Sequence, residues 1–482
     1  MATPLPENHA SFTCGELLEA CAGSSDAPHD LRVQSVSTDS RMIQPGALYI
    51  ALPGDRFDGH AFLDQVAQKG AALAVVRRGA DVPAGLPTIE VDYTLRALGD
   101  IAGFHRRRWG GRVIAVTGSA GKTTTKELLA AALVAISDGG EGTVTKTQGN
   151  LNNLVGVPLT LLTLDESHST AVVEVGTSAP GEIRRLAEIS AADAAVVTAV
   201  AVAHAEGLGS LAGVAEEKMD LLRALPPSGV AVYSADHPIL RTLLSSVQAR
   251  TLSFGEAEDA DVRLREQHIT CGAEGSLAAL CRYSWPQSER SQEVSLAMLG
   301  SGPAVDAAAA LSVVYGLLGA SATLAAAAGL GRVRPVAGRL NPVAGPAGSI
   351  ILDDTYNANP ASVAASLRTL QAVARARQGR ALAVLGDMRE LGAFEADEHA
   401  TVGVQCAQLR LAMLIGCGRA MAGAVEAARS AGLHHVQAVA DAKAALPLLS
   451  GQLRAQDVVL VKGSRSMAME QVVLGLVAEV GR

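Results

Sequence analysis

The chain has 482 residues, of which 49% are hydrophobic and 18% are charged, and its formal net charge at pH 7 is −8. This length suggests about three domains, and the composition is typical of a globular protein with large apolar cores. The acidic balance argues against bulk electrostatic binding of nucleic acid. Six cysteines without a C-x-x-C pair give no zinc signature, so we predict reduced thiols in a cytoplasmic protein. The opening MATPLPENHA lacks the basic and apolar regions of a signal peptide, which agrees with that prediction.

The first predicted domain comprises residues 1–109. It contains short β-like runs at residues 47–52 and 72–76 between proline and glycine turns, which favours a small α/β domain. The basic sequence HRRRWGG at residues 105–111 is interpreted as a linker to the next segment.

The second predicted domain, residues 110–335, alternates apolar strand-like runs with helical stretches. This alternation predicts a mostly parallel sheet with helices on both faces. The expected strands are residues 113–116, 171–175, 194–200 and 230–233. The Ala-rich stretch 304–330 comes nearest to a membrane-spanning run, but Asp306 and many small residues favour a buried helix pair.

A Pro/Gly-rich junction at residues 331–348 leads into the third predicted domain, residues 336–482. Strand-like runs again alternate with helical stretches, which predicts a smaller Rossmann-like domain. The expected strands are residues 350–352, 381–385, 412–415 and 458–461. The predicted fold class is therefore α/β with three domains.

The sequence RVIAVTGSAGKTTTK at residues 112–126 has the layout of a phosphate-binding loop, because a strand-like run, a glycine-rich turn and a helix-like run follow one another. In such a loop, backbone N–H groups and a helix N-terminus face an anion, a lysine adds positive charge and a threonine can ligate Mg²⁺. Val116 stands where a generic P-loop has its first glycine, so the motif is the shorter T-G-x-x-G-K-T. We expect these residues to bind a nucleoside triphosphate: Thr117, Gly118, Ser119, Ala120, Gly121, Lys122, Thr123 and Thr124.

Several motifs together resemble the Mur ligases, which are ATP-dependent amide-bond ligases that build the peptide of bacterial cell-wall precursors. They are T-G-x-x-G-K-T-T-T, E-V-G at residues 174–176, and H-x-E-G-x-G-S at residues 204–210 followed by Lys218. Further stretches narrow the resemblance to the MurF type of the family: STDSR (37–41), GNLNNLVGVPLTLL (149–162), DDTYNANP (353–360), LGDMRELG (385–392) and VKGSRSM (461–467). The likeness covers nearly the whole chain in family order.

The resemblance implies a monomeric enzyme that joins D-alanyl-D-alanine to UDP-N-acetylmuramoyl-tripeptide, with ATP and Mg²⁺, in peptidoglycan precursor synthesis. The γ-phosphoryl group would pass to a carboxylate, and the amine would attack the resulting acyl phosphate. Such chemistry needs alignment and charge neutralisation more than covalent help from the protein. The domains would be a UDP-binding N-terminal domain, a central ATPase domain and a C-terminal substrate domain.

The family likeness also assigns roles to catalytic residues. Lys122 would contact the terminal phosphates, while Thr123 and Glu174 would hold Mg²⁺ with oxygen atoms, the ligands that this hard cation prefers. His204 would lie near a second Mg²⁺. Lys218, in an expected helix at residues 210–225, would be carbamylated, because an ammonium repels Mg²⁺ whereas a carbamate offers it anionic oxygens. Two residues of the last segment, Arg339 and Asp354, would reach ATP on domain closure.

The substrate residues form two groups. The UDP site would comprise Thr38, Asp39, Ser40 and Arg41, with Asn150 and Asn153 on the same nucleotide sugar. D-Alanyl-D-alanine or the tripeptide would be bound by Asn357, Asn359, Lys462, Ser464 and Arg465, near the ends of C-terminal strands.

One stretch departs from the family pattern. Members usually carry G-x-H-N-x-x-N before an Ala-rich helix, with an asparagine near adenine, but residues 300–306 read GSGPAVD. The histidine and both asparagines are missing, so Asp306 or backbone groups would have to substitute in adenine recognition. The residues expected in phosphoryl transfer are unaffected, and we therefore still expect activity.

Three alternatives stay open at this point. A MurE-type ligase would add a diamino acid, although its typical D-N-P-R motif is absent. A folylpolyglutamate-synthetase-like ligase fits poorly with the STDSR segment. A P-loop ATPase without ligation would leave Glu174, His204 and Lys218 unexplained. The third residue of the accepted tripeptide, diaminopimelate or lysine, is not fixed by the sequence.

Overall fold

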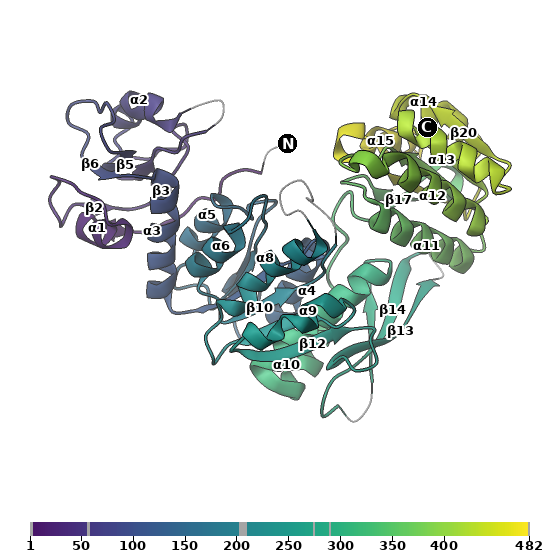
Figure 1. The fold of residues 1–482 in the computed structure, drawn as a ribbon, viewed down its shortest axis with the longest axis horizontal. Coiled ribbons are helices and arrows are strands. Elements are labelled where there is room, and N and C mark those ends of the chain that lie inside the picture. Colours follow the sequence, from purple (N-terminus) through teal and green to yellow (C-terminus); the bar gives the residue numbers. More distant parts are fainter. Residues whose placement is uncertain (1–2, 55–57, 202–209, 273–274, 289–290, 481–482) are drawn as a thin grey trace. The chain divides into compact units, whose positions relative to one another are not determined.

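The computed structural model describes residues 3–54, 58–201, 210–272, 275–288 and 291–480 (Figure 1). Two compact units are present, and each is described by itself. The first comprises Met1–Val262 and Ala309–Ala326, and the second comprises Arg263–Ala308 and Ala327–Arg482.

The first unit begins with a small α/β layer. Its four-stranded sheet is parallel throughout, in the order β3-β4-β5-β6. The bounds are β3 Val36–Ser37, β4 Leu48–Ile50, β5 Leu73–Arg77 and β6 Thr88–Val91. Around it lie β1 (Phe12–Thr13) paired with β2 (Arg32–Val33), α1 (Cys14–Cys21), η1 (Gly59–Phe62), α2 (Leu63–Gln68) and α3 (Thr94–Trp109). Figure 1 shows α3 as the long helix that follows this layer.

Helix α3 corrects one prediction. Residues 105–109 of the predicted linker form its last turns, and the helix ends at Gly110 in the left-handed conformation. The reason is that Arg106 is buried and finds distant partners for its guanidinium. It donates to the Ser190 and Ala191 carbonyls and pairs with Asp193 at 2.9 Å.

The larger sheet of this unit has parallel strands in the order β12-β11-β10-β7-β9-β8. The bounds are β7 Arg112–Thr117, β8 Val144–Lys146, β9 Thr170–Glu174, β10 Ala194–Val197, β11 Val230–Ser234 and β12 Arg250–Gly255. The helices are α4 Lys122–Val134, η2 Gly140–Thr143, α5 Gly156–Leu162, α6 Glu182–Ser190, α8 Leu211–Arg223, α9 Pro238–Thr242 and η3 Leu244–Ser246.

The inner strands β11, β10, β7 and β9 are buried on both faces, as expected of a parallel sheet covered by helices. Alternate residues such as Val113, Ala171 and Ala195 share one apolar core with α5, α6 and α8. On this sheet, α4 contacts β7, β8 and β9.

The second unit contains an antiparallel meander and a six-stranded sheet. The meander joins β13 (Val262–Cys271), β14 (Leu277–Ser284) and β15 (Gln292–Leu296). The six-stranded sheet has the order β16-β17-β21-β18-β19-β20, with only β16 antiparallel to its neighbour. The bounds are β16 Asn341–Ala344, β17 Ile350–Asp354, β18 Ala381–Gly386, β19 Met413–Cys417, β20 Val436–Val439 and β21 Val458–Lys462.

Helices cover both faces of the six-stranded sheet. One core joins Leu352, Leu385 and Leu460 to α11, α12 and α13, and another joins Ile351, Val384 and Val459 to α14 and α15. The bounds are η4 Pro346–Gly348, α11 Pro360–Arg377, η5 Gly392–Phe394, α12 Glu395–Gln408, α13 Arg419–Ser430, α14 Ala442–Leu449, η6 Arg465–Met467 and α15 Glu470–Val480. This two-sided arrangement is the predicted Rossmann-like one.

The Ala-rich stretch forms α10 (Ser301–Leu330), which is broken at Gly319 by a φ of 81°. The predicted helix pair is thus two helical segments around one glycine. Among the described residues, α10 is the helix that is long and apolar enough to cross a membrane by length and composition alone. Many of its small residues are buried inside the protein.

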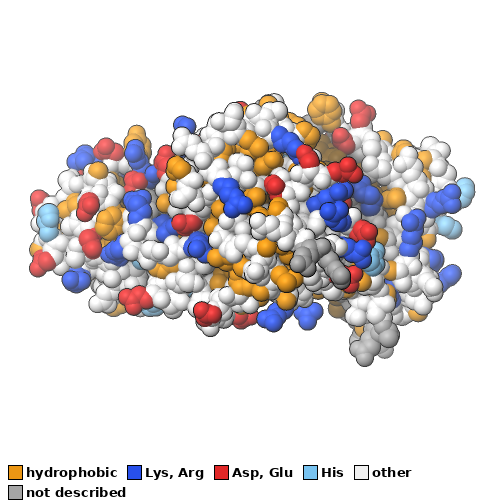
Figure 2. All heavy atoms as spheres, turned by 90° about the horizontal axis from the view of Figure 1, so that it is seen from below, with side chains coloured by type: hydrophobic (Ala, Val, Ile, Leu, Met, Phe, Trp, Pro, Cys, Tyr) orange, Lys and Arg blue, Asp and Glu red, His pale blue; other side chains and the backbone are white. Residues whose placement is uncertain are grey.

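The predicted α/β class and its mostly parallel sheets are confirmed. The domain boundaries at residues 109/110 and 335/336 stay predictions. On the face in Figure 2, acidic and basic side chains are interspersed among hydrophobic ones, in keeping with the modest net charge of −8.

Candidate active site

The predicted phosphate loop lies between β7 and α4 and is held against the chain that follows β10. Ser119 N donates to the Ala199 carbonyl at 2.8 Å. Thr198 Oγ1 donates to the Ala120 carbonyl from the same side. Gly118 has a φ of 156°, and a Cβ there would lie 1.9 Å from Thr198 Oγ1. The loop therefore needs a glycine at this position to approach its neighbour so closely.

The loop fixes the side chain of Lys122 and contains one buried hydroxyl, that of Thr117, without a hydrogen-bond partner among the described residues. Gly121, with a φ of 81°, precedes the first turn of α4, so the first N–H groups of the helix face the loop. Lys122 Nζ donates to the Gly118 carbonyl at 2.7 Å. Thr117 Oγ1 is buried, and no described residue gives it a hydrogen bond. These groups have the chemistry of a phosphate site.

Glu174 ends β9 beside the loop, and its carboxylate is almost fully buried. Thr123 Oγ1 donates to Glu174 Oε2 at 3.0 Å, and Asn152 Nδ2 donates to Oε1 at 3.0 Å. Lys126 Nζ lies 3.9 Å from Oε2. The structure thus brings together two predicted metal ligands, Thr123 and Glu174, and adds two residues that sequence reasoning missed.

Thr123 and Glu174 offer the hydroxyl and carboxylate oxygens that Mg²⁺ prefers. The described residues contain no group of three His, Cys, Asp or Glu side chains that could hold a metal alone. A Mg²⁺ ion at this place would therefore also need oxygens from phosphate or water, as is usual in nucleotide sites. The residues present fit that kind of shared site.

Lys218 is buried on α8 in the same unit. Burial, together with the nearby charge of Lys122, lowers the pKa of Lys218 to about 8, although Glu217 acts in the opposite direction. Glu217 itself accepts hydrogen bonds from the N–H groups of Gly181 and Ile183 at the start of α6. A buried lysine with a low pKa beside a phosphate loop is a candidate functional group. His204, the other predicted ligand, lies outside the described residues.

The predicted UDP residues follow β3. Arg41 donates to both carboxylate oxygens of Asp39, and the closest N–O distance is 2.6 Å. This pairing lowers the pKa of the Asp39 carboxyl. Lys69 Nζ donates to the Ser40 and Arg41 carbonyls at 2.9 and 2.8 Å. The Arg41 side chain is 83% exposed, so its guanidinium is accessible to a ligand.

The asparagines of GNLNN have different partners. Asn153 Oδ1 accepts from the Val155 and Gly156 N–H groups at the start of α5, while Asn150 Oδ1 accepts from Thr3 Oγ1 at 2.6 Å. Asn152, between them, is the one that reaches Glu174. The asparagine-rich run was a visible signal, but the sequence did not show which amide faces the carboxylate.

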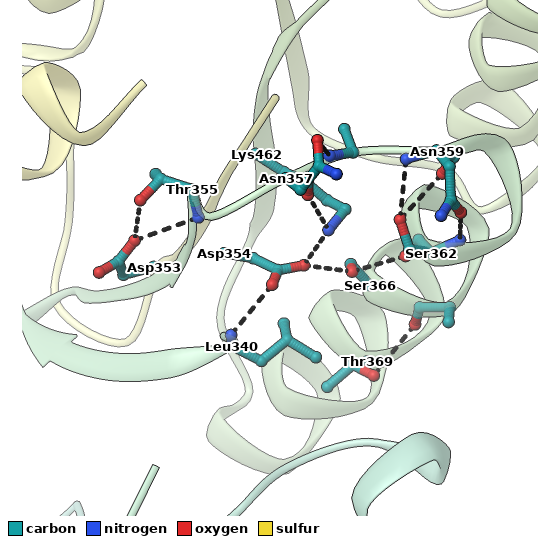
Figure 3. Close-up of polar contacts among 12 residues, drawn as sticks. Leu340, Asp353, Asp354, Thr355, Asn357, Asn359, Ser362, Ser366, Thr369 and Lys462 are labelled. Atoms are coloured by element: carbon teal, nitrogen blue, oxygen red, sulfur yellow. Dashed lines mark hydrogen bonds and ion pairs between the residues drawn. The ribbon is translucent and has the colours of Figure 1, made fainter. Parts of the chain in front are cut away.

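In the second unit, Asp354 is buried at the end of β17 and forms the network shown in Figure 3. Its Oδ2 accepts from Lys462 Nζ and from Ser366 Oγ, each at 2.6 Å. Its Oδ1 accepts from Leu340 N at 3.2 Å. The predicted ATP residue Asp354 and the predicted substrate residue Lys462 are therefore paired with one another.

Arg339 lies in the same unit, just before Leu340. Its guanidinium stacks over the Tyr356 ring at 4.3 Å from the centroid. Tyr356 N donates to the Gly338 carbonyl, and Gly338 N donates to Asp353 Oδ2. The turn that carries Arg339 is thus fixed to the segment after β17.

The remaining predicted substrate residues have local roles. Asn359 caps α11 in a reciprocal box with Ser362 (Figure 3). Asn357 Oδ1 accepts from Ala358 N. Ser464 Oγ accepts from Arg389 N at 2.8 Å. Arg465 is largely exposed, 3.8 Å from Glu470. Their substrate roles stay predictions.

The stretch that departs from the family pattern begins α10. Gly300, with a φ of 95°, precedes the helix, and a Cβ there would lie 2.6 Å from Thr369 Oγ1 on α11. Pro303 stands in the first turn, where its missing N–H costs nothing. Asp306 is buried one turn further on. Local structure thus explains the glycine and the proline, while the contacts to adenine stay unassigned.

The strand–loop–helix cradle and the acidic end of a neighbouring parallel strand define a nucleotide-binding α/β protein of the P-loop class. Family models cover most of the chain. The "Mur ligase family, catalytic domain" matches residues 32–106, the "Mur ligase middle domain" residues 116–314, and the "Mur ligase, glutamate ligase domain" residues 338–465. The chain belongs to the Mur ligase family.

Two similar proteins carry the same name. UDP-N-acetylmuramoyl-tripeptide–D-alanyl-D-alanine ligase of Escherichia coli K12 is 36% identical over 97% of this chain and 98% of its own. The protein of that name from Bacillus subtilis 168 is 33% identical, covering 92% and 93%. Among solved structures, MurF from Acinetobacter baumannii is 30% identical over 98% and 100% of the two chains, with a TM-score of 0.85. MurF ligase from Thermotoga maritima, solved with ADP, is 27% identical over 92% and 97%, with a TM-score of 0.79.

Proposed function

We propose that this chain joins D-alanyl-D-alanine to UDP-N-acetylmuramoyl-tripeptide at the expense of ATP, in the synthesis of peptidoglycan precursors. The observation that carries the proposal is the arrangement of one phosphate loop with two ionisable groups beside it, Glu174 and Lys218. Thr123 bonds to the buried Glu174, and Lys218 is close enough to Lys122 for their charges to interact. The full-length likeness to enzymes of that name supplies the substrates.

The reaction has two steps. The tripeptide carboxylate attacks the γ-phosphorus of ATP, so that ADP leaves and an acyl phosphate forms. The neutral amine of D-alanyl-D-alanine then attacks the acyl carbon, and the tetrahedral intermediate expels inorganic phosphate as the amide forms, while the proton lost from the nitrogen passes to the phosphate or to water. The first step brings two anions together and the second expels an anionic leaving group, so the protein must align the reactants and neutralise charge.

The residues of the first unit suit this task. Lys122 and the N–H groups of the loop bind the terminal phosphates, and Thr123 and Glu174 hold Mg²⁺. When bound, Mg²⁺ neutralises phosphate charge and fixes the γ-phosphoryl group for transfer. Lys218, once carbamylated, would offer an anionic group to the metal, and His204 is assigned to the second metal by family likeness alone.

Other roles follow the family pattern. Arg339 and Asp354 bind ATP, Thr38 to Arg41 with Asn150 and Asn153 bind the UDP moiety, and Asn357, Asn359, Lys462, Ser464 and Arg465 bind the peptide substrates. A cytoplasmic location and a monomeric state belong to the same proposal. The accessible Arg41 guanidinium supports a diphosphate contact.

The test is phosphate release from Mg·ATP with UDP-N-acetylmuramoyl-tripeptide, measured with and without D-alanyl-D-alanine, with the product identified by mass. We expect release to require both substrates and to yield the pentapeptide. ATP turnover that ignores the dipeptide and forms no amide would favour an ATPase without ligation. Amide formation from UDP-N-acetylmuramoyl-dipeptide and a diamino acid would instead favour the MurE-type alternative.

A further inference from the structure

Lys126 is a buried ammonium on α4 that the proposed reaction does not use. Only 2% of its side chain is exposed. It donates to the Thr147 carbonyl at 2.8 Å, and its charge faces Glu127 at 3.2 Å and Glu174 at 3.9 Å. A buried charge is costly unless it is paired, and an apolar side chain would pack α4 at lower cost. The presence of a lysine at position 126 therefore needs a reason other than packing.

The partners of Lys126 converge on one carboxylate. Thr147 accepts from Lys126 with its carbonyl and from Glu174 N with its hydroxyl at 2.9 Å. Asn152 donates to Glu174 Oε1, while Oε2 faces Lys126 and accepts from Thr123. Both carboxylate oxygens are thus fixed from different elements.

The backbone around Asn152 shows how closely this contact is built. Gly176 N donates to the Asn152 carbonyl at 2.7 Å. A Cβ on Gly176 would lie 3.1 Å from the Asn152 amide carbon and oxygen, closer than most side-chain contacts. The glycine therefore leaves the space in which the amide reaches Glu174.

The orientation of Glu174 decides what Thr123 can do. When Thr123 Oγ1 donates its proton to Glu174 Oε2, the lone pairs of the hydroxyl point elsewhere and can ligate a cation. If the Glu174 carboxylate turned away, the Thr123 hydroxyl would lose this hydrogen bond, and the two oxygen ligands would no longer be held in one arrangement. Groups that hold such ligands in place commonly matter for metal affinity.

We propose that Lys126 and Asn152 are positioning residues that hold the Glu174 carboxylate against Thr123, so that the pair is ready to bind Mg²⁺ together with the nucleotide. This inference rests on the proposed function, because it assigns a Mg·nucleotide site to the loop. It predicts a defect in the contribution of Mg²⁺ to nucleotide binding, with binding in the absence of the metal preserved.

The test uses three variants of the full chain. Lys126→Met and Asn152→Ala remove the two positioning groups. Lys146→Met is the matched control, because Lys146 pairs with Glu127 in the same cluster and is 44% exposed, with no contact to Glu174 among the described residues. ADP affinity is measured by titration calorimetry in Mg²⁺ and again in EDTA, and circular dichroism and melting temperature check the fold.

We expect the wild-type chain and Lys146→Met to bind ADP more tightly in Mg²⁺ than in EDTA. Lys126→Met and Asn152→Ala should each lose about tenfold or more of that gain, the usual effect of removing a group that orients a metal ligand. Their affinities in EDTA should match the wild type. If Lys126→Met does not fold, Asn152→Ala tests the inference alone, because Asn152 is only half-buried and its replacement should disturb the fold less.

Two results would overturn the inference in distinguishable ways. Folded variants that keep the full wild-type gain from Mg²⁺ would show that Lys126 and Asn152 only stabilise the fold, and the proposed function would stand. A wild-type chain that gains no affinity for ADP from Mg²⁺ would contradict the proposed function itself and the inference with it.

Discussion

Lys218 places a second positive charge in the interior near Lys122. Burial and this neighbour lower the pKa of Lys218 to about 8, so a considerable share of the side chain is a neutral amine near pH 8. The neutral amine is the form that reacts with carbon dioxide. Carbamylation would replace a repelled cation with an anion, which relieves the charge conflict and creates a metal ligand at the same time.

Replacement of Lys218 tests the carbamate directly. Lys218→Ala should lose most activity, on the order of 100-fold or more, because a positioned electrostatic group typically contributes that much. Short carboxylic acids should restore part of it by occupying the space of the carbamate. Phosphate release with both substrates is the measurement. Undiminished activity of Lys218→Ala would remove this residue from the mechanism.

The unmodified lysine should also carry a stability cost that depends on pH. The pKa in the folded state, about 8, lies below the ordinary 10.5. The cost of burying the ammonium is therefore fully present below pH 8 and fades as pH rises toward 10.5. Its size is about 3 kcal/mol, from about 1.4 kcal/mol per unit of pKa shift.

Lys218→Met never carries this charge. In buffer free of carbon dioxide we expect it to unfold at higher urea than the wild type at pH 7, with the difference shrinking by pH 10. Urea titrations at both pH values measure this. A difference that does not change with pH would mean that the ammonium is solvated in the folded protein.

At the scale of elements, the periodicity of the sequence predicted many of the helices and strands, but it did not predict contacts between residues far apart in the chain. The run before Gly118 and the alternation of strands and helices were sufficient to predict β7, α4 and the parallel sheets. The end of α3 was misassigned because Arg106 finds its partners about 85 residues away, at Ser190 and Ala191. The choice of Asn152 over its neighbours likewise depends on Gly176, which only the folded chain brings near.

Arg106 should be a main support of the junction between α3 and the large sheet. Arg106→Met would leave the Ser190 and Ala191 carbonyls without this donor and Asp193 without its cation. Because the Asp193 side chain is 46% exposed, the loss of the ion pair itself should cost little, and the loss of the hydrogen bonds to the two carbonyls should cost about 1–3 kcal/mol. Chemical denaturation measures the loss. Arg107→Met is the matched control one residue along the same helix, and because Arg107 is exposed it should change stability by less than about 0.5 kcal/mol. Equal effects of the two variants would contradict this role for Arg106.

At the scale of the whole molecule, the sequence predicted the α/β class and the order of its parts. It could not predict the pairing of Lys462 with Asp354, because strand order places β21 beside β17 although about a hundred residues separate them. It also could not decide how adenine is bound without the family asparagines. Pro303 and Gly300 fit the start of α10, but that local fit says nothing about the ligand.

The two compact units, each with its own apolar cores, should respond differently to nucleotide. A chain built from separate cores is expected to unfold in more than one thermal transition. The phosphate loop lies in the first unit. At a hundredfold excess over its Kd, Mg·ADP should therefore stabilise that unit by about 2.7 kcal/mol and raise the temperature of its unfolding transition. Scanning calorimetry with and without Mg·ADP measures the shift. Lys122→Ala removes the charge that we propose contacts the phosphates, so this variant should lose most of the shift, and an equal shift would place the nucleotide away from the loop.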